Sequence, residues 1–176
     1  MAKTILVTGP IGSGKSVVCR YLASLDFPVY ECDARTKMLY SLVPGLKCSI
    51  EERLSLPWSQ IGQVFSEPDK LRTLEEIVYP YVVEDLKAWK DEHGDKAPLL
   101  FVESAIALDK PQFDGLYDEV LLVSAPLEVR TRRNPKVAER DALQTFDPAR
   151  IHYTLPNEGT QEELYIKIRQ LICKLI

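Results

Sequence analysis

The octapeptide from Gly9 to Ser16 constrains the fold of this chain more than any other segment. It reads GPIGSGKS and matches the pattern G-x-x-x-x-G-K-[ST] at every fixed position. The glycines of such a loop let the backbone curl, so that successive N–H groups point at one anion. An apolar run precedes the loop and an amphipathic helical pattern follows it, which is the context this pattern requires. The segment predicts a phosphate-binding loop; a glycine-rich turn that binds nothing is the alternative.

The loop pattern assigns chemistry to particular side chains. Lys15 is expected to bring a point charge to the β- and γ-phosphates of a nucleotide, and Ser16 to offer its hydroxyl directly to Mg²⁺. ATP and Mg²⁺ are therefore the predicted substrate and cofactor. The residues predicted to bind the nucleotide through the loop are Ile11, Gly12, Ser13, Gly14, Lys15, Ser16 and Val17.

Strand and helix patterns alternate along the rest of the chain, which predicts an α/β fold of the P-loop type. We expect a mainly parallel sheet of about five strands with helices on both faces. Pro80 lies inside a helical pattern and is expected to kink or split that helix. Thr160 and Glu163 form a predicted capping box before the closing helix. The expected strands are residues 4–8, 27–33, 98–102, 119–123 and 151–155; the expected helices are 15–25, 34–43, 68–93, 126–133 and 161–175, with short helices and loops over 45–68.

Composition excludes several classes of protein. The chain has 176 residues, of which 45% are apolar and 27% charged, so a single globular domain fits and long disorder does not. No apolar run approaches the ~20 residues of a membrane span, and no leader pattern is present, which leads us to expect a cytoplasmic protein without a membrane partner. The net charge of −4 argues against nucleic-acid binding. Four scattered cysteines and two histidines argue against a zinc cluster.

The kind of nucleotide-binding protein follows from what accompanies the loop. The guanine-binding pattern N-K-x-D is absent from the sequence. Residues 91–94 fit D-x-x-G, but they end a predicted helix instead of following a strand. The small size and one-domain layout favour a nucleotide-type kinase.

Acidic residues at the carboxyl ends of predicted strands are the candidates for catalysis, because ligands of parallel sheets bind there. Asp33 follows the second strand, which we expect beside the loop strand, and its carboxylate could accept the proton of an acceptor hydroxyl. A helix N-cap is the alternative for Asp33. Glu103 ends the third strand and could orient Mg²⁺ through water or position the acceptor; a solvated loop acid is its alternative. Asp109 is a weaker candidate.

A basic segment follows the fourth strand and predicts a lid that closes on the phosphates. Arginine spreads positive charge over a transferring phosphoryl group. Arg133 and Arg140 are the first choices for this role, and a solvated charged helix is the alternative. The basic residues between 127 and 150 are Arg130, Arg132, Arg133, Lys136, Arg140 and Arg150.

The order of these features resembles the dephospho-coenzyme A kinase family over most of the chain. The resemblance implies ATP-dependent phosphorylation of the ribose 3′-hydroxyl of dephospho-CoA. The pieces that carry it are the loop 8–16, Asp33 within YECD, Val64-Phe65, the helical LEEIVYP of 74–80, the strand 119–123 before Arg130 and Arg133, and Asn157-Glu158-Gly159.

The resemblance also implies an organisation and further site residues. Residues 1–34 and 97–176 would form the core of a single kinase domain, 35–96 an inserted helical region that binds the acceptor, and 130–150 the lid. Asn157 would lie near the adenine, and Asp33 would be the base.

The chain departs from the family pattern mainly in the acceptor half. Tyr79 stands where the family usually has a histidine before proline, and we assign it with Asp33 and Glu103 to acceptor binding. Residues 103–109 and 58–60 also differ from the family pattern. Two other functions stay open: a kinase of another nucleoside or small hydroxyl compound, and an ATP-binding protein with little or no transfer. The sequence sets no oligomeric state.

Overall fold

The computed structural model describes residues 2–137 and 145–176, which divide into two compact units. The sheet unit comprises residues 1–31 and 89–176, and the helical unit comprises residues 32–88. In chain order the elements are β1 (Lys3–Thr8), α1 (Lys15–Ser24), β2 (Val29–Glu31), α2 (Cys32–Leu42), α3 (Leu46–Leu54), α4 (Pro68–His93), β3 (Leu99–Glu103), β4 (Glu119–Ser124), α5 (Leu127–Arg133), β5 (Tyr153–Pro156) and α7 (Gln161–Leu175), with 3-10 helices at Trp58–Ser66, Ala107–Asp109, Pro111–Phe113 and Pro148–Arg150.

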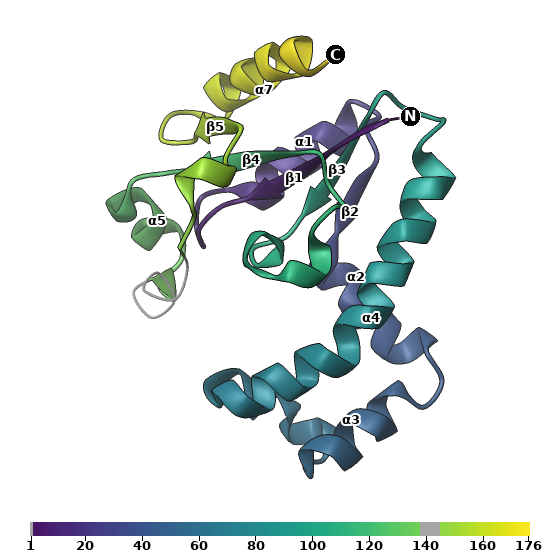
Figure 1. The fold of residues 1–176 in the computed structure, drawn as a ribbon. Coiled ribbons are helices and arrows are strands. Elements are labelled where there is room, and N and C mark those ends of the chain that lie inside the picture. Colours follow the sequence, from purple (N-terminus) through teal and green to yellow (C-terminus); the bar gives the residue numbers. More distant parts are fainter. Residues whose placement is uncertain (1, 138–144) are drawn as a thin grey trace. The chain divides into compact units, whose positions relative to one another are not determined.

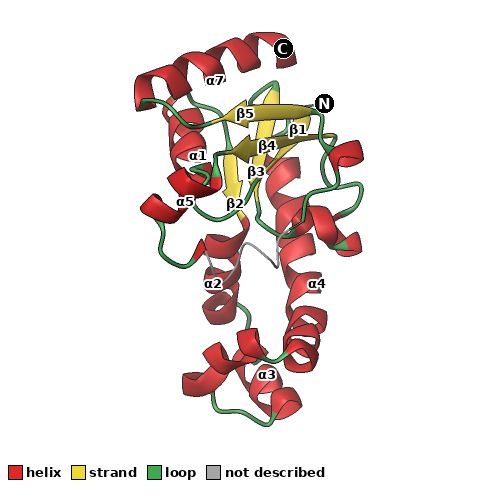
Figure 2. Cartoon of the chain, turned by 90° about the vertical axis from the view of Figure 1, so that its left-hand side faces the viewer, coloured by secondary structure: helices red, strands yellow, loops and turns green. Residues whose placement is uncertain are grey.

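The sheet unit is built on five strands in the order β2-β3-β1-β4-β5, and every neighbouring pair is parallel (Figures 1 and 2). The predicted parallel α/β sheet of about five strands is thereby confirmed. Val7 pairs with Glu103, and Glu103 pairs with Glu31, so the carboxyl ends of β1, β3 and β2 share one edge. The loop that follows β1 leaves the sheet at this edge.

The position of β2 corrects one expectation from the sequence. We expected the strand before Asp33 to lie beside the loop strand, but β3 lies between them. The burial of the two strands explains the order. Four of the five residues of β3 are buried, as an interior strand requires, whereas β2 has three residues and ends on an exposed glutamate.

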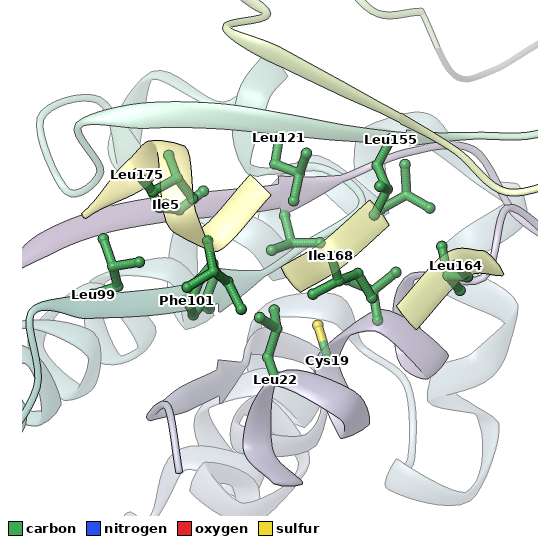
Figure 3. Packing of buried hydrophobic residues seen from close by; sticks show 14 residues of the cluster. Ile5, Cys19, Leu22, Leu99, Phe101, Leu121, Leu155, Leu164, Ile168 and Leu175 are labelled. Carbon is green, nitrogen blue, oxygen red and sulfur yellow. The ribbon is translucent and has the colours of Figure 1, made fainter. Parts of the chain in front are cut away.

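Helices α1 and α7 cover one face of the sheet, and Figure 3 shows their side chains meeting those of the strands. Tyr30 of β2 belongs to the opposite face, where Trp89 from the end of α4 contacts it edge-on at a centroid distance of 5.4 Å. Both faces are thus covered by helices, as predicted. The buried side chains of this hydrophobic core are Ile5, Val7, Leu99, Phe101, Leu121, Val123 and Leu155 from the strands, Val18, Cys19 and Leu22 from α1, and Leu164, Ile168, Ile172 and Leu175 from α7.

The capping box predicted at the start of α7 is present. The backbone N–H of Glu163 donates to the Thr160 hydroxyl at 3.2 Å, and the backbone N–H of Thr160 donates to the Glu163 carboxylate at 2.7 Å. Two backbone groups at the helix start are thereby satisfied, which fixes the beginning of the helix that covers the core.

Replacing Thr160 by alanine should lower the free energy of unfolding by about 1 kcal/mol, because the substitution removes the cap acceptor. Urea unfolding measures this change. Thr160→Ser should retain most of the stability, since serine caps as well as threonine. Thr131→Ala, at an exposed threonine inside α5, is the matched control and should change stability by a few tenths of a kcal/mol. Equal stability of Thr160→Ala and the wild type would contradict the capping role.

The structure corrects one local expectation and excludes one of the two outcomes expected for another. Helix α2 begins at Cys32, so Asp33 lies in its first turn and is not its N-cap. A carboxylate in that turn is still favourable, because it faces the positive end of the helix dipole. Helix α4 continues unbroken from Pro68 to His93 with Pro80 inside it, so it is not split. Packing of its apolar side chains outweighs the one backbone hydrogen bond that proline cannot make.

The helical unit consists of α2, α3, the 3-10 helix Trp58–Ser66 and α4 up to Ala88. Arg35 of α2 forms a two-pronged ion pair with Asp85 of α4, with nitrogen–oxygen distances of 2.9 and 2.6 Å. The rings of Tyr40 and Trp58 meet edge-on at 4.9 Å. These contacts join three segments of the unit.

Among the described residues, no helix combines the length and the apolar character needed to traverse a bilayer. The cytoplasmic location stays a prediction.

Candidate functional site

The loop from Gly9 to Ser16 has a backbone that favours glycine at three of its positions. Gly9, Gly12 and Gly14 have φ values of 151°, 78° and 99°, which L side chains rarely adopt. A Cβ on Gly12 would come within 2.8 Å of the Arg130 carbonyl oxygen, and one on Gly14 within 2.2 Å of the Asn157 amide nitrogen. The glycines therefore allow both the curl of the loop and its close contact with the segments behind it.

Replacing Gly14 by alanine should destabilise the protein by more than the strain of a left-handed residue alone. Gly115 offers the matched control, because its φ is 79° and no atom would lie within 4 Å of an added Cβ. Gly115→Ala should cost about 1–2 kcal/mol from the backbone alone. Gly14→Ala adds the collision with Asn157 and should cost more. Urea unfolding of both variants measures the difference, and equal losses would contradict the close packing described for Gly14.

Lys15 lies over the loop that precedes it. Its ammonium group donates to the carbonyl oxygens of Gly9 at 2.7 Å and Pro10 at 3.4 Å. The positive charge is thus held at the loop and is only partly buried. A phosphate bound by the loop would offer this ammonium group a charged acceptor, which forms a stronger hydrogen bond than a carbonyl oxygen.

The remaining predicted loop residues have different surroundings. Ser16, in the first turn of α1, is exposed, whereas Ser13 is buried. The carbonyl of Ile11 accepts a bond from Arg130 at 3.5 Å. Val17 belongs to α1 and packs against the core, which makes it a support of the loop as well.

Three residues contact the backbone of the loop: Asn157, which directly follows β5, and Arg130 and Arg133 of α5. The Asn157 amide donates to the Ser13 carbonyl oxygen at 2.8 Å. Arg133 donates to the carbonyls of Gly12 and Ser13 at 3.2 and 3.3 Å, and to that of Asn157 at 2.9 Å. Arg130, which the sequence analysis did not select, is buried and donates to the Ala125 carbonyl at 3.0 Å. Its spacing of three residues from Arg133 on one helix was the available signal.

The predicted lid is only partly within the described residues. Arg140 lies outside them. Arg150, at the far end of the segment, contacts the loop between β3 and β4: its guanidinium donates to the Leu108 carbonyl, and to Asp114 and Tyr117 at 2.8 Å each. The role of residues 130–150 as a lid stays a prediction.

Glu103 is at the carboxyl edge of the sheet, partly buried, beside Glu31 in the parallel register. Burial raises the pKa of the Cys19 thiol in α1, and the charges of Glu103 and Glu31 raise it further. Two carboxylates thus lie near the core side of the loop helix. Asp109 lies in the short helix Ala107–Asp109 and is exposed.

In the helical unit, Asp33 lies near two tyrosines. Burial raises the pKa of Tyr40, and the Asp33 charge raises it further. The pKa of Tyr79 is raised by burial, then by the charge of Glu75 and a hydrogen bond with it, and by the charge of Asp33. Tyr79 therefore stays a neutral phenol that can donate or accept a hydrogen bond at neutral pH. The structure brings Asp33 and Tyr79, both assigned to acceptor binding, into one neighbourhood.

A parallel sheet whose first strand runs into this loop and helix defines a P-loop nucleotide-binding protein. A dephospho-CoA kinase of Chlorobium chlorochromatii is 31% identical over 197 aligned positions, covering 97% of this chain and 92% of that protein. A dephospho-CoA kinase of Porphyromonas gingivalis is 35% identical over 139 aligned positions, which cover 74% of this chain and 67% of that protein. A crystal structure from Thermus thermophilus is 30% identical, with a TM-score of 0.78 over 99% of this chain and 98% of that one. No family model matches the chain. On these relatives, the chain belongs to the dephospho-CoA kinase family.

Proposed function

We propose that the protein transfers the γ-phosphoryl group of ATP to the 3′-hydroxyl of the ribose of dephospho-CoA. The acceptor oxygen forms a bond to the γ-phosphorus while the bond to the bridging oxygen breaks, and ADP leaves. The hydroxyl proton passes to a carboxylate. The observation that carries this proposal is the 31% identity to a dephospho-CoA kinase over 97% of the chain. The phosphate loop, with every fixed position of its pattern filled, supports the ATP half.

The loop residues take the nucleotide roles in this proposal. Backbone N–H groups of residues 11–17 bind the phosphates, and Lys15 stabilises the charge that develops on the transferring group. Mg²⁺ fits the donors present, because the exposed Ser16 hydroxyl and the carboxylates at the sheet edge are the hard oxygen ligands that it prefers. Ser16 would hold it directly and Glu103 through water. The ion neutralises phosphate charge when bound.

The acceptor roles fall to Asp33 and Tyr79 of the helical unit and to Glu103 of the sheet unit. Asp33 accepts the hydroxyl proton, and Tyr79, whose own O–H is engaged by Glu75, accepts a hydrogen bond from the acceptor. The helical region 35–96 binds the CoA end of the acceptor. Glu103 helps to position it.

A coupled assay of ADP release with a panel of acceptors tests this function. Turnover with dephospho-CoA should exceed turnover with nucleosides, shikimate and sugars, and the product should carry its new phosphate on the ribose 3′-oxygen. Faster turnover with another acceptor would favour a kinase of that compound. Tight binding of ATP and Mg²⁺ with no acceptor turned over would favour a nucleotide-binding protein without transfer.

A further inference from the structure

The carbonyl oxygen of Ser13 is held by two side chains from distant parts of the chain. Asn157 donates its amide to it at 2.8 Å, and Arg133 donates a guanidinium N–H to it at 3.3 Å. Arg133 also donates to the backbone carbonyl of Asn157 at 2.9 Å. The three residues therefore form a closed set of hydrogen bonds, called the Ser13 clamp below.

The Ser13 clamp fixes the direction of a backbone donor that it does not touch. The peptide unit between Ser13 and Gly14 is planar and trans, so its C=O and N–H point in opposite directions. Holding the Ser13 carbonyl towards Asn157 and Arg133 directs the Gly14 N–H away from them. In a phosphate loop, successive N–H groups of this kind are the donors to the bound anion.

The two side chains suit a positioning role. Asn157 is only 7% exposed, and a buried side-chain amide has to be hydrogen-bonded. A guanidinium presents its donors in a fixed fork, which a single ammonium group cannot reproduce. Arg132, the next residue, is instead exposed and pairs with Glu128 on the surface of α5. Only one of the two neighbouring arginines faces the loop.

We propose that Asn157 and Arg133 are positioning residues: they hold the Ser13 carbonyl and thereby aim the Gly14 N–H at the nucleotide phosphates. This inference rests on the proposed nucleotide function of the loop. It gives Asn157 a role different from the adenine contact that the family resemblance implies. It also explains why Gly14 must lack a side chain, since the Asn157 amide occupies that space.

Inorganic tripolyphosphate distinguishes loop positioning from adenine contact, because it has phosphates and no base. Its affinity and that of ATP are measured by titration calorimetry for Asn157→Ala, which changes no charge. The inference expects both ligands to bind roughly tenfold more weakly, by similar factors, the scale of one lost hydrogen bond with its partner left unpaired. Asn157→Asp, of the same size, replaces the donor by a carboxylate that can only accept and repels an anion, so it should weaken both ligands at least as much. Glu158→Ala, at the exposed neighbour, should bind both ligands as the wild type does.

Arg133→Lys separates the fork from the charge. If Arg133 positions the loop, Arg133→Lys should bind tripolyphosphate more weakly than the wild type although it keeps the positive charge. Arg132→Lys is the matched control and should bind tripolyphosphate as the wild type does. The double variant of Arg133→Lys and Asn157→Ala should lose less than the product of the single losses, because both side chains act on one carbonyl.

Three results would overturn the inference: wild-type tripolyphosphate affinity in Asn157→Ala with ATP affinity reduced, wild-type affinity in Arg133→Lys, or multiplicative losses in the double variant. A wild-type protein that binds neither ligand would overturn the proposed function and this inference with it. If the variants bind both ligands as expected but the wild type does not phosphorylate dephospho-CoA, only the proposed function is contradicted. The test of the Ser13 clamp depends on ligand affinity and not on turnover.

Discussion

Lys15→Ala should lower kcat by at least about 10²-fold, because the change removes the one side-chain charge that the loop itself carries. The loss of one electrostatic stabiliser in an enclosed site has this magnitude. The backbone donors stay in place, since the Lys15 ammonium is itself a donor, to the Gly9 and Pro10 carbonyl oxygens, and its removal deletes no backbone N–H of the loop. ATP affinity should fall as well, because the same charge attracts the phosphates of the bound substrate. The ADP-release assay gives kcat and the KM for ATP.

A matched control shows whether the loss is specific to the loop. Lys96 is exposed and pairs with Glu92 on the surface, so Lys96→Ala should keep wild-type kinetics. A thermal melt of each variant confirms that the fraction folded is the same. Full activity in Lys15→Ala would mean that the loop does not act on the phosphates.

Asp33→Asn should lower kcat for dephospho-CoA by ~10²–10⁴-fold, the range for loss of a general base. Asparagine keeps the shape and hydrogen-bonding capacity of the side chain and removes the proton acceptor. ATP binding should persist, because the loop that binds it is unchanged. Presteady-state quench measurements of product give the rate of the chemical step, and calorimetry gives the affinity for ATP.

The alternative for Asp33 is a purely structural carboxylate in the first turn of α2. In that case Asp33→Asn would cost about 0.3–1 kcal/mol of stability through the helix dipole and leave turnover per folded molecule unchanged. Asp69 occupies the first turn of α4 and offers a matched control. Asp69→Asn should show only the stability loss. The same behaviour in Asp33→Asn would sink the catalytic role.

The fold could be predicted largely because its signals are local. The loop pattern, the apolar strands and the Thr160 capping box depend on residues within a few positions of one another, and each is found where expected. The order of the strands depends on which of them is the most apolar on both faces. The alternation of strands and helices along the chain does not rank the strands in this way. For that reason the position of β2 was missed.

The surroundings of the site residues were less predictable for a similar reason. Lys15 and Ser16 follow from a pattern of eight residues. The contact of Asn157 with Ser13 joins residues 144 positions apart and uses a polar side chain that many loops contain. Arg133 was selected for its charge, whereas its hydrogen bonds to the loop depend on the orientation of α5, which the sequence does not specify. The catalytic and binding roles assigned to these residues stay predictions.

The distribution of aromatic residues gives each compact unit its own optical reporter. The chain contains two tryptophans: Trp58 in the helical unit, packed on Tyr40, and Trp89 in the sheet unit, packed on Tyr30. In a variant that retains only one of them, the emission follows the melting of a single unit. Coincident transitions for the two variants would identify the protein as one cooperative folding unit, and separate transitions would give each unit a stability of its own.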